Sequence, residues 1–284
     1  MSVRDHRDDL IVIIDPVARR TDGESVRIAK DVLGAGAALK VCLPDGPEEF
    51  ARALLRRGAR RPVVVGDDAA LRRAVGVLHR ERALAGAEVA VVPVGAAASA
   101  VRLARALGVP TGAVEAARAV LDGAPRRLDL LVDDRDEVVL GDVRIPALAD
   151  EGAVDGVGGE AEGEERRPWL RTCQSLVRTL GARPSRVASA GPSRLRVEAD
   201  GVTLVDLDQP VAAVCVAPGG GGLARVEVRP SGVGAQGAPV RARARSVTVS
   251  GPDFRYRADV VTGGPVRTRT WAVHPQTWQL TLPV

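Results

Sequence analysis

Val63-Val64-Val65-Gly66-Asp67-Asp68 is the stretch that decides the fold, and Val91-Val92-Pro93-Val94-Gly95-Ala96 repeats its pattern. Each is an apolar run that ends at a glycine and leads into residues with helical spacing. A turn of this kind, at the carboxyl edge of a parallel sheet, commonly holds a nucleotide phosphate, because backbone N–H groups at the start of the helix point at the anion. The two stretches therefore predict an α/β domain with a candidate phosphate site.

The sequence around these turns alternates between strands and helices. Apolar runs predict strands at residues 10–14, 38–43, 62–65 and 89–92, and amphipathic spacing predicts helices at 24–33, 47–57, 68–82, 99–107 and 114–121. Continuous Val and Ile runs between such helices indicate strands that are covered on both faces, as in a parallel sheet. We assign residues 1–130 to an α/β domain of the nucleotide-binding type.

Residues 131–284 follow a different pattern. Short alternating strands are predicted at 195–198, 203–207, 212–216, 224–229, 240–250, 254–258, 268–273 and 277–282, with Gly, Pro and Asp between them. They predict an antiparallel β-sandwich-like domain, whose final strand could return to the first domain. Residues 150–165 contain no Lys or Arg and read as an acidic, Gly-rich loop, with an acidic clamp as the alternative, and a helix is expected at 168–180.

Composition limits the classes of function. The chain has 284 residues, 45% of them hydrophobic, so two domains can each bury a core. We expect a cytoplasmic protein, because the N-terminus is too charged for a signal peptide. Aromatic residues make up only 2%, which disfavours a nucleic-acid stacking surface. The three cysteines, Cys42, Cys173 and Cys215, are far apart, and the histidines lack metal-ligand spacing, so no metal site or disulfide is expected.

Four segments carry a family resemblance. Residues 13–16 read Ile-Ile-Asp-Pro, residues 65–71 Val-Gly-Asp-Asp-Ala-Ala-Leu, residues 93–102 Pro-Val-Gly-Ala-Ala-Ala-Ser-Ala-Val-Arg, and residues 258–261 Ala-Asp-Val-Val. In order and spacing they resemble the Asn-Pro turn, the Gly-Gly-Asp-Gly-Thr-Leu and Pro-Leu-Gly-Thr-Gly-Asn-Asp-Phe-Ala-Arg segments, and the Asp-Gly-Glu segment of the diacylglycerol kinase catalytic family. That family includes bacterial lipid kinases and sphingosine kinases and shares its fold with NAD kinases.

The resemblance implies a nucleotide site at the two turns, with ATP or another nucleotide and Mg²⁺ as the cofactors, and a carboxylate that takes the proton from a lipid hydroxyl. On this basis Asp259 is the candidate catalytic residue. The candidate nucleotide-binding residues are Asp15, Gly66, Asp67, Asp68, Gly95, Ala96 and Ser99. Each has a structural alternative: a tight turn for the glycines, a helix N-cap for Asp67 and Ser99, and a hairpin position for Asp259.

Several family residues are replaced. Asp68 and Ala69 stand where the family has Gly and Thr, Ala96 where it has Thr, and Val260 and Val261 where it has Gly and Glu. Phosphoryl transfer depends on positioning and on neutralising the developing charge. We therefore expect a degenerate lipid-kinase-like protein that binds a nucleotide, a nucleotide-derived ligand or a protein partner without efficient transfer. The alternative is an active ATP-dependent kinase that uses Asp67, Asp68 and Asp259 around Mg²⁺ to phosphorylate diacylglycerol or a related lipid hydroxyl.

The partner predictions follow from charge and topology. A nucleotide or small anionic ligand could meet Arg19, Arg20, Arg72 and Arg73, if these face the cleft between the domains. A lipid or membrane surface is a further candidate partner, and exposed strand edges could pair into a homodimer. Two other segments are interpreted as having no functional role: we predict a solvated loop at residues 133–137 and a flexible glycine turn at residues 219–222.

Overall fold

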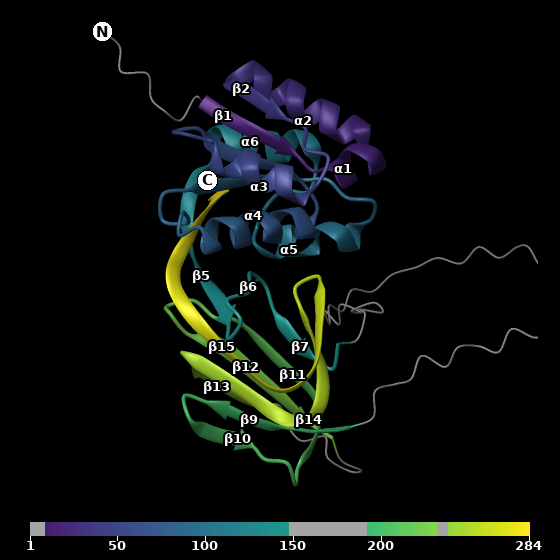
Figure 1. The fold of residues 1–284 in the computed structure, drawn as a ribbon, viewed down its shortest axis with the longest axis vertical. Helices are drawn as coiled ribbons and strands as arrows, with labels where there is room; N and C mark the ends of the chain where they lie inside the picture. Colours follow the sequence, from purple (N-terminus) through teal and green to yellow (C-terminus); the bar gives the residue numbers. More distant parts are fainter. Residues whose placement is uncertain (1–8, 148–191, 232–237) are drawn as a thin grey trace, which may run out of the picture.

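A computed structural model describes residues 9–147, 192–231 and 238–284. The acidic segment 150–165 and the helix expected at 168–180 lie outside the described residues. An α/β domain stands above a β-domain along the long axis of the molecule, and one long strand, drawn in yellow, runs through both (Figure 1). The predicted fold class, an α/β domain with a parallel sheet followed by an antiparallel β-domain, is confirmed.

The N-terminal sheet contains four parallel strands. They are β1 (Asp9–Ile14), β2 (Ala38–Cys42), β3 (Arg61–Gly66) and β4 (Glu88–Pro93), in the spatial order β4-β3-β1-β2. Strands β1, β3 and β4 are buried over five consecutive residues each. Only a strand covered on both faces can bury every residue in this way.

Helices cover both faces of this sheet. Alternate residues of β1 point to opposite sides: Leu10 and Val12 face the core formed with α2 (Gly23–Gly36) and α6 (Ala113–Asp122). Ile11 and Ile13 face the core formed with α3 (Pro47–Leu55), α4 (Asp68–Arg80) and α5 (Arg102–Ala106). The short helix α1 (Pro16–Thr21) begins directly after β1. Among the described helices, none is long and apolar enough to pass through a membrane.

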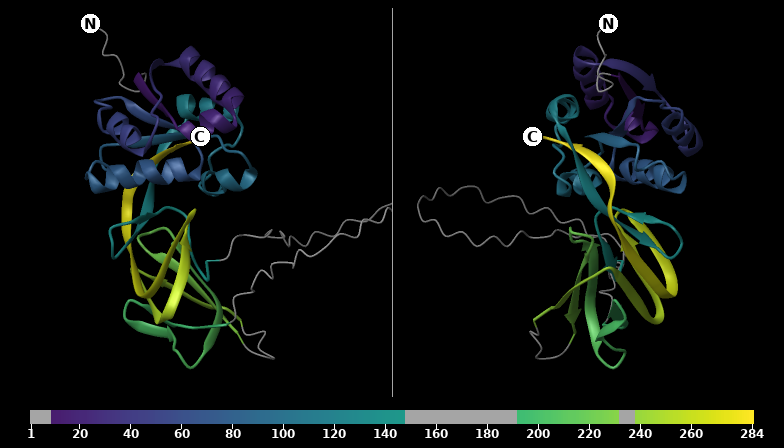
Figure 2. Two further views of the ribbon diagram at one scale, coloured as in Figure 1. Left: turned by 45° about the vertical axis from the view of Figure 1, so that its right-hand side comes forward. Right: turned by 90° about the vertical axis from the view of Figure 1, so that its left-hand side faces the viewer.

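The β-domain is built from antiparallel pairs around its own core. Its strands are β6 (Val138–Val139), β7 (Val143–Ile145), β8 (Ser193–Arg194), β9 (Arg196–Ala199), β10 (Val202–Val205), β11 (Pro210–Pro218), β12 (Ala224–Pro230), β13 (Val240–Ala244) and β14 (Ser246–Ala258). Tyr256 and Trp271 meet edge to face in this core, with ring centroids 5.4 Å apart. Figure 2 shows the strands wrapping around that core below the α/β domain.

Two strands join the domains. β5 (Ala124–Asp133) pairs antiparallel with β15 (Val261–Leu282), and β15 also pairs in parallel with β4 at Gln279 and Leu280. Trp271 on β15 lies in the core of the β-domain, whereas Trp278 lies in the core of the α/β domain. Both indole side chains are fully buried, so β15 contributes a large apolar side chain to the core of each domain.

The structure corrects several predicted elements. The strand expected at 240–250 is divided at Arg245, whose backbone N–H donates to the Asp200 carboxylate instead of to a neighbouring strand. The strands expected at 268–273 and 277–282 are one strand, β15, with a register shift after His274. The helix expected at 99–107 begins as a 3₁₀ turn, Ala98–Val101, and becomes the short helix α5. Strands β5, β6 and β7 were not predicted.

Candidate functional site

The two glycine turns are places of close backbone approach. A Cβ atom on Gly66 would lie 2.7 Å from the Cβ of Ala70 and 3.0 Å from that of Asp15. A Cβ atom on Gly95 would lie 2.8 Å from the Cβ of Ala100. Packing of each strand end against the following helix is therefore sufficient to require glycine at both positions. Ala96 lies exposed in the second turn.

The adjacent carboxylates of the first turn have separate structural roles. Asp67 begins α4 as its N-cap, where its side chain accepts from the backbone N–H of Ala70 at 2.9 Å. Asp68 is buried, and its two oxygens accept from the backbone N–H groups of Leu103 at 2.7 Å and Ala104 at 3.0 Å. Burial raises the pKa of Asp68, against the lowering effect of these two hydrogen bonds. Asp68 therefore fixes the start of α5 rather than facing an open site.

Ser99 is not a helix N-cap, which was the structural alternative to its predicted role in nucleotide binding. It lies exposed inside the 3₁₀ turn, and the N-cap position of that turn belongs to Ala97, which makes no side-chain cap hydrogen bond. The hydrogen bonds that Ser99 could have supplied at the start of α5 come instead from Asp68, which reaches across from α4. The sequence does not indicate that Asp68 takes the capping role of Ser99, because the two residues belong to different turns.

Asp15 is buried at the end of β1 and has two partners. One carboxylate oxygen caps α1 by accepting from the N–H of Val17 at 2.8 Å, and the other accepts from Arg73 Nη1 at 2.6 Å. The Arg73 guanidinium also lies 5.5 Å from the centroid of the Phe50 ring. A buried carboxylate needs such a partner, so Arg73 holds the turn after β1 against α4.

Asp259 occupies the tip of the hairpin between β14 and β15, in the left-handed backbone region with φ of 54°. Its side chain is fully buried and accepts backbone hydrogen bonds from Gly141 at 2.7 Å, Leu140 at 2.9 Å and Asp142 at 3.2 Å. Arg72 Nε, on α4, lies 4.0 Å from Asp259 Oδ2. Burial raises the pKa of Asp259 to about 6, although the three N–H donors and Arg72 act in the opposite direction.

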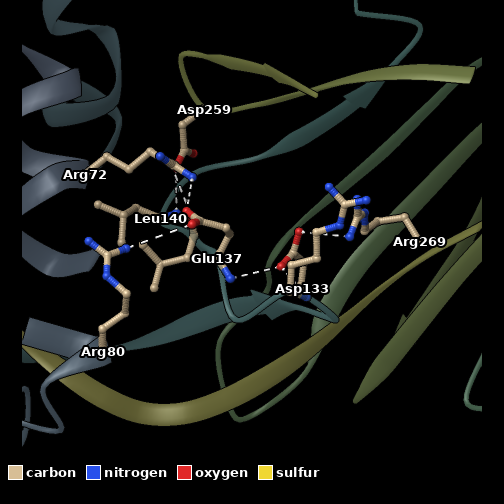
Figure 3. A network of polar contacts seen from close by, with 9 residues as sticks. Arg72, Arg80, Asp133, Glu137, Leu140, Asp259 and Arg269 are labelled. Carbon is tan, nitrogen blue, oxygen red and sulfur yellow. Dashed lines mark hydrogen bonds and ion pairs between the residues drawn. The ribbon is translucent and has the colours of Figure 1, made fainter. Parts of the chain in front are cut away.

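A cleft of about 210 Å³ opens beside this carboxylate, between α4 and the β-domain. Arg72, Arg73 and Arg80 line it from α4, Glu137 lines it from the loop before β6, and the hairpin tip contributes Val260 and Val261. Arg72 Nη2 lies 3.2 Å from Glu137, and Arg80 Nη1 lies 3.9 Å from it (Figure 3). Arg73 is paired with Asp15 and Arg72 also lies near Asp259, so each of the three guanidinium groups has a carboxylate beside it. We call this cleft the arginine cleft.

The cationic candidates divide between this cleft and the surface. Arg72 and Arg73 line the arginine cleft, as their helical spacing allows. Arg19 instead forms an ion pair of 3.1 Å with Asp45, and Arg20 is exposed on α1. Sequence reasoning missed Arg80, although its spacing of eight residues from Arg72 and seven from Arg73 places all three on one side of α4. A second hollow, of about 220 Å³, lies beside Gly95 and is lined by Asp22, Ser25 and Arg105.

Residues 134–137 form an exposed turn, in agreement with the predicted solvated loop, and the buried Asp133 anchors that turn. Asp133 is buried and accepts from the backbone N–H groups of Arg135 and Glu137, each at 2.9 Å. The buried Arg269 lies 3.6 Å from Asp133 and also donates a hydrogen bond to Asp134 (Figure 3). In the same loop, Asp136 lies 2.8 Å from His79 Nε2 on α4 and accepts a hydrogen bond when that nitrogen carries the proton. The loop thus carries polar contacts from the β-domain to the α/β domain.

The glycine turn at 219–222 is held in place as well. The N–H of Gly222 donates to Asp129 Oδ2 at 2.9 Å, and the N–H of Gln276 donates to Asp129 Oδ1 at the same distance. Asp129 lies on β5, the strand that enters the β-domain. This buried carboxylate therefore ties one end of the predicted glycine turn to the junction of the domains. An aspartate inside a strand gave no sequence signal for that role.

Comparison with known proteins agrees with this architecture. Residues 9–132 match the family model described as "Diacylglycerol kinase catalytic domain". A solved structure of a diacylglycerol kinase from Bacillus anthracis str. Sterne superposes with a TM-score of 0.67 at 12% sequence identity, with 97% of each chain covered. A solved structure of a proposed diacylglycerol kinase from the same organism gives 0.68 at 13%, again over 97% of each chain. No curated protein matches the chain.

Proposed function

We propose that the protein, whose residues 9–132 match the family model of the diacylglycerol kinase catalytic domain, binds a phosphate-bearing ligand of the nucleotide class in the arginine cleft without efficient phosphoryl transfer. The observation that carries the proposal is the burial of the Asp259 side chain among backbone N–H groups. Its carboxylate is enclosed by three backbone N–H groups, where a lipid kinase of this family needs a base that can reach a hydroxyl.

The arginine cleft supplies the binding half of the proposal. Arg72 and Arg80 approach the single carboxylate of Glu137 from the same helix, and Arg73 lines the same wall. Guanidinium groups match phosphate oxygens in both charge and geometry. A ligand phosphate would bind Arg72 and Arg80 in place of the half-exposed carboxylate of Glu137.

The residues of this site suit the phosphate groups of a nucleotide–magnesium complex better than they suit its Mg²⁺ ion. Kinases of this family generally use ATP with Mg²⁺, which is held by carboxylate and phosphate oxygens. Here Asp68 and Asp259 direct both of their oxygens at backbone N–H groups, and Asp67 caps α4. The three aspartates therefore fit structural roles better than a magnesium site, whereas the arginines fit the phosphates.

Loss of the base function follows from the same geometry. For Asp259 to take a proton from a substrate hydroxyl, that hydroxyl would have to reach a carboxylate that is fully buried and enclosed by the backbone N–H groups of residues 140–142. Val261, where the family has Glu, adds an apolar surface at the hairpin tip instead of a second acid. Asp259 thus stabilises the fold by binding the backbone of residues 140–142 and is not available as a proton acceptor.

The test is ligand-induced stabilisation of the purified full chain. Thermal shift is measured with ATP, ADP, NAD and cyclic dinucleotides, each with and without Mg²⁺. A ligand at 100 times its dissociation constant should stabilise the fold by about 2.7 kcal/mol. We expect stabilisation by a nucleotide, its loss in Arg72→Gln/Arg80→Gln, and its retention in the control Arg52→Gln, an exposed arginine on α3. Stabilisation that survives loss of Arg72 and Arg80 would contradict the proposal.

One observation favours the alternative of an active lipid kinase. The pKa of Asp259, raised to about 6, lies closer to neutrality than that of an ordinary aspartate, which suits a general base. Transfer of radiolabel from ATP to diacylglycerol by the wild type, lost in Asp259→Ala and unaffected by Asp253→Ala on the preceding strand β14, would establish this alternative. Absence of label together with nucleotide binding supports the non-catalytic role.

A further inference from the structure

The loop between β5 and β6 contacts one face of α4 through two neighbouring residues. One carboxylate oxygen of Glu137 lies 3.2 Å from Arg72 Nη2, and the other lies 3.9 Å from Arg80 Nη1 (Figure 3). The carboxylate of Asp136 lies 2.8 Å from His79 Nε2. His79 and Arg80 follow Arg72 by seven and eight residues on α4, which places all three on one side of the helix. A single loop of the β-domain therefore meets a single face of the α/β domain.

The backbone of this loop is fixed from the side of the β-domain. The buried carboxylate of Asp133 accepts from the N–H groups of Arg135 and Glu137, and the N–H of Asp133 donates to the carbonyl oxygen of Glu137 at 3.0 Å. Asp136 adopts the left-handed backbone conformation, with φ of 64°, which aspartate tolerates better than most residues do. Because the backbone is held in this way, the loop presents the side chains of Asp136 and Glu137 to α4 together.

The Glu137 side chain is the part of this contact that can leave. It is 50% exposed, whereas the Arg72 side chain is 17% exposed and also donates from Nε to the carbonyl oxygen of Val138 at 3.2 Å. An ion pair with a half-exposed partner is weak, so a competing anion can displace the carboxylate while the backbone of the loop stays in place. Arg72 thus stays fixed at the cleft when the carboxylate opposite it rotates away.

We propose that residues 136–137 form an autoinhibitory latch on the arginine cleft. The Glu137 carboxylate occupies the guanidinium groups of Arg72 and Arg80, and the contact between Asp136 and His79 holds the carboxylate in that position. His79 is a positioning residue, because it acts on the cleft through Glu137. Since the latch and a ligand phosphate use the same guanidinium groups, each weakens the binding of the other by the same factor. The effect on a ligand rests on the proposed function, whereas the latch belongs to the ligand-free protein.

The first measurement follows ATP binding to the full-length chain by calorimetry. Glu137→Gln should raise the affinity about three- to fivefold, because the competing carboxylate is lost. His79→Ala should raise it about twofold in the wild-type background and leave it unchanged in the Glu137→Gln background, since His79 acts through Glu137. The matched control is Glu81→Gln. Glu81 is the exposed C-cap residue of α4, beside Arg80 in the sequence, and its loss should change the affinity less than about 1.5-fold.

The second measurement needs no ligand, so it separates failure of the latch from failure of the proposed function. Phenylglyoxal modifies accessible guanidinium groups, and mass spectrometry of peptides identifies each modified arginine. Arg72 should react about threefold faster in Glu137→Gln, and about twofold faster in His79→Ala, than in the wild type. The exposed Arg52 on α3 is the internal control and should react at the same rate in all three proteins.

The two measurements together decide the proposal. Faster modification of Arg72 in both variants, without ATP binding to any of the proteins, would support the latch and contradict the proposed function. An unchanged rate at Arg72 would overturn the latch even if ATP binds. Equal gains in affinity in Glu137→Gln and Glu81→Gln would also overturn it, because they would show that only the net charge near α4 matters.

Discussion

The carboxylate of Asp68 accepts a hydrogen bond from the backbone N–H of Leu103 at 2.7 Å, which joins two turns that lie 35 residues apart in the sequence. Its other oxygen accepts from Ala104. At this position the resemblance leads one to expect a glycine beside a phosphate. The chain instead uses a side chain of its own to satisfy the start of the next helix, as a bound anion would at a helix N-terminus.

We predict that Asp68→Asn lowers the free energy of unfolding by about 1–3 kcal/mol, because one of the two buried N–H groups loses its acceptor. Asp67→Asn should cost less than Asp68→Asn, since asparagine is also a good N-cap and residue 67 is less buried. Chemical denaturation of the wild type and the two variants measures this difference. Equal destabilisation by the two substitutions would contradict the role assigned to Asp68.

A second prediction concerns pH. The native pKa of Asp259 is about 6, above the ordinary value of 3.8, so the folded protein holds this proton more tightly than the unfolded chain. The contribution of the group to stability is therefore fully present below pH 3.8 and is lost as pH rises through 6. With a shift of about two units the loss amounts to ~3 kcal/mol.

The measurement compares the free energy of unfolding of the wild type and Asp259→Asn between pH 4 and pH 7. The difference, wild type minus variant, should decrease as pH rises, because only the wild type ionises at this position. Asp253→Asn, at an exposed aspartate on the preceding strand β14, serves as the control. A difference that stays constant over this range, or that increases, would show that Asp259 is already ionised at low pH.

Part of the fold was predictable because its determinants are local. The buried Val runs of β3 and β4 and the amphipathic spacing of α4 define those elements within a few residues of sequence. Strand β5 was missed because its exposed first half contains Pro125, Arg126 and Arg127, which resemble a solvated connection, although Leu130-Leu131-Val132 is a buried run that could have indicated a strand. Periodicity measures local burial and is blind to a strand that passes from one domain into the other.

The candidate site was less predictable, because its contacts are between residues distant in the sequence. The carboxylate of Asp259 meets backbone N–H groups 117 to 119 residues away, and that of Asp129 meets Gly222 across 93 residues. No spacing rule links such positions. An aspartate can serve as a base or a metal ligand, but burial and backbone hydrogen bonds show that these two carboxylates stabilise the fold.

A third prediction tests the buried cation at the domain junction. Arg269 is 2% exposed and lies between Asp133 and Asp134. Arg269→Met should lower the free energy of unfolding by about 3–5 kcal/mol, because it leaves the buried Asp133 carboxylate without its cation. Arg267→Met, at an exposed arginine paired with Asp253, should change it by less than about 1 kcal/mol. Similar losses for the two variants would mean that the ion pairs of Arg269 contribute no more than a surface pair.

The last prediction separates packing from phosphate binding at the glycine turns. Gly66→Ala should lower the free energy of unfolding by about 1–3 kcal/mol even without ligand, because the new Cβ would meet Ala70 and Asp15 at 3.0 Å or less. Gly86→Ala is the matched control, since a Cβ there has no neighbour within 4 Å, and it should stay within about 0.5 kcal/mol of the wild type.

Guanidinium denaturation of the ligand-free proteins measures both changes. If Gly66→Ala folds as stably as the wild type yet loses nucleotide stabilisation, the glycine is kept for the ligand and the packing argument fails. If it is destabilised and its residual folded form still binds nucleotide, the ligand is held elsewhere in the cleft, as the arrangement of Arg72, Arg73 and Arg80 predicts. A glycine required by its own helix cannot by itself be evidence for a phosphate.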